Sequence, residues 1–133
     1  MKYICLGYYD KAKFEAMPQA EQHAMFDACF TYDDHLRANG HWVGGEALQP
    51  AETARTLHSK KGKVAVTDGP YAETKEQIGG ILVLEARDMD HAVQLISQHP
   101  ALKFGSIFEI RAVGDMSDIM KASEQRRRQA VAR

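Results

Sequence analysis

The chain has 133 residues, of which 44% are hydrophobic and 26% charged, a composition typical of one globular domain with a core of its own. No apolar run approaches the roughly 18 residues of a membrane-spanning helix, and two cysteines without CxxC spacing exclude a disulfide scaffold. Residues 1–10 read as a strand rather than a signal peptide, because they lack a long apolar segment, and we therefore expect a cytoplasmic protein.

The net charge of −1 is unevenly distributed along the chain. Residues 121–133 carry a charge of +4, whereas residues 1–120 carry −5. An acidic body argues against a nucleic-acid-binding domain, because such a domain needs a basic face. We expect the basic tail to be a frayed or weakly docked helix, with contact to an acidic partner as the alternative.

The first part of the chain predicts a strand followed by a long helix. Residues 2–9 are apolar or aromatic on both faces, which suits a central strand covered on both sides. Residues 10–17 read as a polar connection, after which Pro18 opens a helix that Asn39-Gly40 ends. The apolar stripe of this helix consists of Met25, Ala28, Cys29, Tyr32 and Leu36, with Phe26 and Phe30 as a second buried edge.

The remainder predicts five strands and a second helix. HWVGGEALQP reads as a strand that its glycine pair disturbs with a bulge. Lys60-Lys61-Gly62 is typical of the turn in a hairpin between TARTLHS and KVAVTD. ILVLEA (81–86) is a further strand, Asp88 caps a helix that Pro100 ends, and SIFEIRAV is the final strand.

The order strand, helix, strand, hairpin, strand, helix, strand indicates an α+β fold. Its spacing predicts a ferredoxin-like plait, in which both helices cover one face of a mostly antiparallel sheet and the β-hairpin is an insertion. The opposite face of the sheet would be left bare, although its strands are apolar on both sides. We therefore expect a homodimer that covers this face.

The segments GGEALQP (44–50), TART (53–56) and above all VTDGPYAETKEQIGG (66–80) resemble the YCII-related family. More narrowly they resemble its DGPF branch, whose Asp-Gly-Pro-Phe motif reads Asp68-Gly69-Pro70-Tyr71 in this chain. The resemblance covers residues 1–113 as one domain and leaves residues 114–133 as a basic C-terminal tail or helix. It implies a dimeric α/β barrel in which two sheets pack face to face, and a link to sigma factors through gene proximity and fusion.

A shorter branch of this family resembles an enzyme with a His–Asp pair. The resemblance places its histidine on the first helix and its aspartate before a proline that follows the second helix. Here the residue before Pro100 is His99, and the histidines of the first helix are His23 and His35, so the pair does not match residue for residue. We interpret His99 as peripheral.

The motif segment supplies the candidate site. Asp68 follows a strand and precedes Gly-Pro, so it either caps a turn or acts as a general base at the mouth of a cavity. Glu73 and Glu76 share a face if residues 72–77 form a helical turn, although charged runs are commonly only solvated. The candidates for catalysis are Asp68, His41 and Glu73, and those for ligand binding are Tyr71, Lys75 and Glu76.

His41 is a candidate because it follows the helix cap and begins a strand beside Trp42 and near Glu46, although a half-exposed strand-start residue is the simpler interpretation. We expect no metal, because paired carboxylates without nearby histidines are a weak signal, and we expect no cofactor. No nucleophile elbow, Cys–His arrangement or Walker motif is present in the sequence.

These observations predict a small cofactor-independent enzyme with isomerase- or lyase-like acid/base chemistry on a small organic acid. Its pocket would lie between the helices and the sheet or at a dimer interface. The alternative is a non-catalytic dimer, linked to sigma-factor systems, that binds a small-molecule ligand or a regulatory protein.

Overall fold

The computed structural model describes residues 1–132, which form one four-stranded antiparallel sheet, a separate two-stranded hairpin and the helices around them. The sheet has the order β2-β5-β1-β6. Its strands are β1 (Lys2–Asp10), β2 (Trp42–Ala47), β5 (Glu76–Glu85) and β6 (Ile107–Ala112). This is the order of a ferredoxin-like plait, and it confirms the predicted α+β fold.

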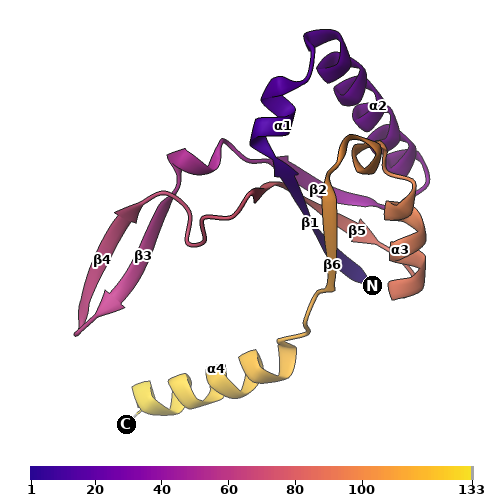
Figure 1. Ribbon diagram of the computed structural model, residues 1–133. Coiled ribbons are helices and arrows are strands. Elements are labelled where there is room, and N and C mark those ends of the chain that lie inside the picture. The colour runs from indigo at the N-terminus through magenta and orange to yellow at the C-terminus, as the bar shows by residue number, and fades with distance from the viewer. Residues whose placement is uncertain (133) are drawn as a thin grey trace.

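Helices α2 (Gln19–Ala38) and α3 (Met89–Ser97) lie together on one side of this sheet (Figure 1). Alternate residues of β1 and β5 point toward them, as the period of two along a strand requires. The buried core consists of Tyr3, Cys5, Leu82, Leu84 and Ala86 from the sheet side, Leu36 from α2, and Ala92 and Ile96 from α3.

The helix boundaries follow from local capping. Asp88 Oδ1 accepts a hydrogen bond from the His91 backbone N–H at 2.8 Å, which confirms the predicted cap of α3. Asp10 Oδ1 likewise accepts from the Lys13 N–H at 3.2 Å and starts helix α1 (Lys11–Ala16). The prediction of a polar connection over residues 10–17 was therefore wrong, because this cap stabilises a helical turn that carries no apolar periodicity.

The strands carry the expected bulge and one unexpected extension. The pairing of β2 with β5 shifts between Trp42 and Gly44, as the glycine pair predicted. Strand β5 begins at Glu76, five positions before the predicted ILVLEA, so the second half of the motif segment is sheet and not loop. Residues 72–75 form no helical turn.

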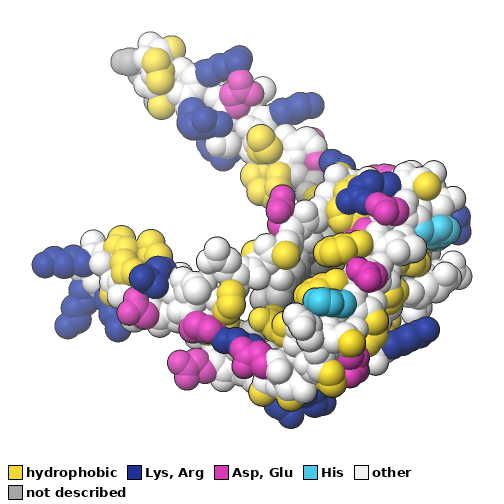
Figure 2. All heavy atoms as spheres, turned by 90° about the horizontal axis from the view of Figure 1, so that it is seen from above, with side chains coloured by type: hydrophobic (Ala, Val, Ile, Leu, Met, Phe, Trp, Pro, Cys, Tyr) yellow, Lys and Arg dark blue, Asp and Glu magenta, His cyan; other side chains and the backbone are white. Residues whose placement is uncertain are grey.

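Strands β3 (Arg55–Lys60) and β4 (Lys63–Asp68) form an arm that extends away from the sheet (Figures 1 and 2). A one-turn 3-10 helix, η1 (Ala51–Thr53), precedes it. Positive φ angles at Lys61 (50°) and Gly62 (78°) fit a type I′ turn and confirm the predicted hairpin. Helix α4 (Ser117–Ala132) forms a second projection from the body. Among the described residues, no helix has the length and apolar character to cross a bilayer.

The second predicted edge of α2 is not buried. Phe26 and Phe30 stack at 6.2 Å between ring centroids, yet both are exposed, Phe30 by 62%. Their side of the helix faces the short α1, whose Phe14 lies 5.8 Å from Phe26. The two phenylalanines therefore extend an aromatic surface and do not complete a core.

Candidate functional site

A cavity of about 630 Å³ lies between α1 and α2 on one side and the helix-facing side of β1, β2 and β5 on the other. Eight aromatic residues line it: Tyr8, Tyr9, Phe14, Phe26, Phe30, Trp42, Phe104 and Phe108. Ionisable side chains at its lining are Asp10, Lys13, Cys29, Asp33, Arg37, Glu46 and His99, together with Cys5 and Tyr8. The size and the largely aromatic walls are typical of a small-molecule site.

Glycines in the sheet make room for these aromatic walls. A Cβ added at Gly45 would lie 2.8 Å from Cη2 of Trp42, and one added at Gly79 would lie 2.6 Å from Cδ1 of Tyr9. Both separations are far below van der Waals contact, so each ring needs glycine beside it. The Trp42 ring also carries the Arg37 guanidinium 4.3 Å above its centroid, which is a cation–π arrangement.

Asp33 and His99 form the polar centre of the cavity. His99 is only 8% exposed, and its Nε2 lies 3.5 Å from Oδ1 of Asp33. At this distance the contact is longer than a hydrogen bond. Among the residues that the structure describes, Asp33 Oδ1 is buried and has no hydrogen-bond partner. A buried carboxylate oxygen of this kind lowers the stability of the fold unless it accepts a hydrogen bond from another donor.

The imidazole of His99 is fixed on several sides. Its Nδ1 accepts a hydrogen bond from the Ala101 N–H at 3.2 Å, which caps the 3-10 helix η2 (Pro100–Phe104). The Phe108 ring lies 5.0 Å from the imidazole and the Tyr32 ring 5.5 Å from it. Tyr32 is itself held, because its hydroxyl donates to the carbonyl oxygen of Leu95.

The neighbouring thiols and phenol remain neutral near pH 7. Burial raises the pKa of the Cys5 thiol to about 11. Burial, reinforced by the negative charge of Asp33, raises the pKa of Cys29, and burial also raises that of Tyr32.

The motif residues Asp68 and Tyr71 lie at the base of the arm and not at the cavity. Asp68 has an 87% exposed side chain and pairs with Nε of Arg55 at 3.2 Å. The turn that follows is fixed by backbone groups, since Gly69 donates its N–H to the Ala54 carbonyl at 2.8 Å. The Tyr71 ring is exposed and lies 5.8 Å from the ring of His58.

The polar half of the motif segment folds on itself beside the cavity. Gln77 Nε2 donates to the Thr74 carbonyl at 2.6 Å and to the Ala72 carbonyl at 3.4 Å, and the second bond closes the loop that contains the exposed Glu73. Lys75 Nζ lies 3.6 Å from Oδ2 of Asp10, the cap of α1. Glu76 pairs with Asp10 in the sheet register. Lys75 is thus the candidate that reaches a cavity residue.

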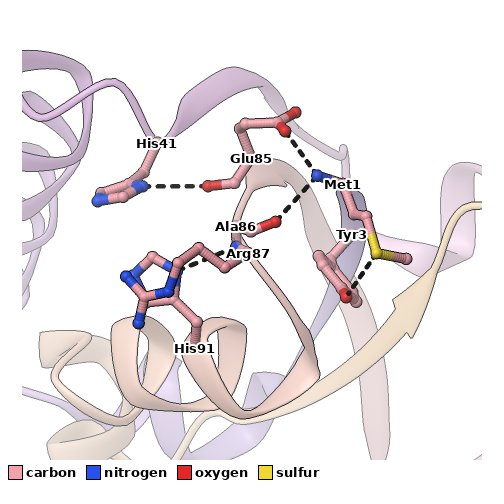
Figure 3. A network of polar contacts seen from close by, with 7 residues as sticks. All are labelled: Met1, Tyr3, His41, Glu85, Ala86, Arg87 and His91. Carbon is pink, nitrogen blue, oxygen red and sulfur yellow. Dashed lines mark hydrogen bonds and ion pairs between the residues drawn. The ribbon is translucent and has the colours of Figure 1, made fainter.

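His41 belongs to a polar network at the opposite end of the sheet (Figure 3). Its Nδ1 lies 3.1 Å from the Glu85 carbonyl, and its ring lies 5.1 Å from that of His91. Partial desolvation and the charge of Arg87 lower the pKa of His91. The Met1 ammonium donates to Glu85 Oε1 at 2.6 Å and so joins the same network.

The structure thus does not bring the six sequence-based candidates together in one site, and their functional roles stay predictions. Asp33 was missed although it lies on the stripe of Cys29, Tyr32 and Leu36, where a carboxylate is out of place. His99 was wrongly interpreted as peripheral, although a histidine directly before Pro100 is well placed to cap the next turn. Within residues 1–132, no group of three or more His, Cys, Asp or Glu side chains has the arrangement of a metal site.

Comparisons with known proteins place this architecture in a family. The model of the YCII-related domain matches residues 1–117. The chain belongs to the YCII-related family. An uncharacterized protein of Rhizobium meliloti (strain 1021) is 33% identical over 95 residues, which cover 70% of this YCII-related chain and 75% of the relative. The narrower DGPF branch stays a prediction.

A solved structure shares the fold of this YCII-related chain. It is 5-chloro-2-hydroxyhydroquinone dehydrochlorinase from Burkholderia phenoliruptrix AC1100, in complex with 2,5-dihydroxybenzoquinone. The TM-score is 0.52 at 16% identity, and the match covers 86% of this chain and 94% of that one. At this identity the likeness concerns the fold alone.

Proposed function

We propose that this YCII-related protein is a small enzyme that catalyses proton transfer on a small organic acid, in the manner of an isomerase or lyase. The reaction takes place in the cavity between α2 and the sheet, with Asp33 and His99 as the reacting pair. The observation that carries the proposal is the buried Oδ1 of Asp33, which lacks a hydrogen-bond partner within residues 1–132 and lies 3.5 Å from His99 Nε2.

A ligand explains this arrangement better than a purely structural role does. A buried carboxylate oxygen without a donor destabilises the fold, so a site that retains one benefits from a bound donor. The aromatic walls accept an apolar or planar body, while Arg37 and Lys13 at the lining suit an anionic group. The fold neighbour, named as a dehydrochlorinase of a hydroxylated ring, supports small-molecule chemistry as the class of function.

The test is a thermal-shift screen of organic acids, followed by measurement of deuterium uptake from D2O into each compound that binds. We expect at least one compound to raise the melting temperature of the wild type and to exchange a proton, and we expect Asp33→Asn to suppress both effects. Asp27→Asn is the matched control, because Asp27 is an exposed aspartate on the same helix. Binding and exchange that persist in both Asp33→Asn and His99→Asn would rule out this site.

We further propose that the chain forms a homodimer through the sheet face opposite the helices. Ile81 and Ile107 are exposed there, and Leu6 lies beside Ile81 in the register. A contiguous apolar face of this kind is rarely left in water. Ile81→Glu should convert the dimer to a monomer in sedimentation equilibrium, whereas Val64→Glu on the arm should not; a wild type that sediments as a monomer contradicts the proposal.

The second candidate function is a regulatory dimer that binds a partner protein, with a sigma-factor system as the context implied by the family resemblance. Helix α4 favours it, because this helix projects from the body with exposed Ile119 and Met120 and carries the basic run Arg126 to Arg128. A chain truncated after residue 116 discriminates the two functions. Under the enzyme proposal this truncation leaves proton exchange intact, whereas under the regulatory proposal it removes partner binding.

A further inference from the structure

The hydrogen bond at Nδ1 determines the protonation state of His99. A backbone N–H can only donate, so the Nδ1 atom that accepts from Ala101 at 3.2 Å must carry a lone pair and no proton. A neutral imidazole with a bare Nδ1 has its proton on Nε2. This Nε2–H is the group that lies 3.5 Å from Oδ1 of Asp33.

A second proton on this ring would conflict with the fold. Protonation at Nδ1 would set two donors against each other and remove the cap of η2, whose first residue, Pro100, has no N–H to compensate. The rings of Phe108 and Tyr32 lie against the imidazole and restrict its rotation to another partner. His99 is therefore poorly suited to gain and lose a proton during a reaction.

Asp33 meets the requirements of a proton acceptor that His99 does not meet. Its Oδ1 has no hydrogen-bond partner among residues 1–132, Asp33 lines the cavity, and Nε2 of His99 lies 3.5 Å from this oxygen. Three titratable groups that lie in the same cavity or against His99 are Cys29 and Tyr32 on α2 and Cys5 on β1. The raised pKa values of all three leave them protonated and unavailable as bases. Arg37, one turn along α2, is paired with Asp34 at 2.7 Å.

We infer that Asp33 is the general base of this site and that His99 is a positioning residue held as the Nε2–H tautomer. The base assignment rests on the proposed function, whereas the tautomer assignment does not. In the forward step a C–H or O–H bond of the ligand breaks, its proton bonds to the Asp33 carboxylate, and the electron pair stays on the ligand. The protonated Asp33 then returns the proton to another atom of the ligand or to a leaving group, which regenerates the carboxylate.

The first test is nitrogen NMR of the full chain labelled at its histidine ring nitrogens, with His99 assigned by its loss in His99→Asn. We expect an unprotonated Nδ1 and a protonated Nε2 that stay unchanged between pH 5.5 and pH 8. The exposed His23 serves as the internal control, because its ring is open to solvent. An Nδ1–H tautomer, or a second ring proton on His99 within this pH range, overturns the inference.

The second test compares exchange rates in two variants. Asp33→Asn should lower kcat roughly 100-fold or more, as loss of a general base does. His99→Asn keeps an oxygen acceptor for the Ala101 N–H, so it should lower kcat less, by about 10-fold. The decline of kcat at acid pH should still follow the protonation of one carboxylate in this variant. An active Asp33→Asn together with an inactive His99→Asn would reverse the roles while leaving the proposed function intact. If no compound exchanges a proton, the proposed function fails and the tautomer measurement still decides the state of His99.

Discussion

Leu36 anchors the helix that carries the site, so its truncation tests how strongly the core holds Asp33 in place. The side chain is fully buried, one turn after Asp33 on α2, and it belongs to the core formed with β1 and β5. Leu36→Ala removes buried methyl groups and leaves a cavity behind. Buried leucines of this kind contribute about 2–5 kcal/mol to the free energy of unfolding.

Urea unfolding followed by circular dichroism at one fixed protein concentration measures the effect, because a dimer makes stability depend on concentration. The total free energy of unfolding of a domain is typically about 5–15 kcal/mol, so the loss caused by Leu36→Ala should lower the urea midpoint clearly. Leu57→Ala is the control, since Leu57 on the arm is 64% exposed and the same truncation there should cost under about 0.5 kcal/mol. A Leu36→Ala variant within about 1 kcal/mol of the wild type would refute the assigned core.

Three further predictions concern single groups. Because the pKa of Cys5 rises from 9.0 to about 11 on folding, the unfolded chain loses this proton first and stability falls between pH 9 and pH 11, by at most about 1.4 kcal/mol per pH unit. Cys5→Ala should flatten that decline in urea titrations at pH 8 and pH 10, and a decline parallel to the wild type contradicts the assignment. Asp88→Ala should lower the free energy of unfolding by about 1 kcal/mol through loss of the α3 cap, while Asp88→Asn keeps most of it. Asp68→Asn should unfold like the wild type and keep any ligand-induced rise in melting temperature, because its ion pair with Arg55 is exposed. Loss of that rise would indicate that the ligand binds at the motif segment and not at Asp33.

The sequence predicted the sheet and its two long helices because their signals are local. The apolar stripe of α2, the cap at Asp88 and the glycine in the β3–β4 turn each act within a few residues of themselves. Helix α1 was not predicted, because this polar six-residue helix has no apolar periodicity and depends on one capping hydrogen bond to Asp10. The extension of β5 to Glu76 depends on pairing with distant β1, which composition does not reveal.

The site was harder to predict than the fold because it joins residues that are far apart in the chain. The motif around Asp68 is conspicuous in sequence, yet the structure uses it to close the base of the arm. Asp33 and His99 come from separate elements, and neither belongs to a sequence motif. Their meeting depends on how α2 and η2 pack, and a polar residue on an apolar stripe was the local sign that pointed to it.

The register of β1 has a consequence for the kinetics of folding. Lys2 pairs with Glu85 and Tyr3 pairs with Ala112, so both neighbours of this central strand lie far along the chain. Contacts of such long range require loop closure before any stabilisation is gained, and they slow folding. The arm, with Leu57 opposite Val66, closes locally, but a two-stranded hairpin of this kind is marginally stable by itself and builds no core. Until the long-range contacts of β1 form, this apolar strand has two unpaired edges. It is then the segment of this chain most exposed to pairing with another molecule.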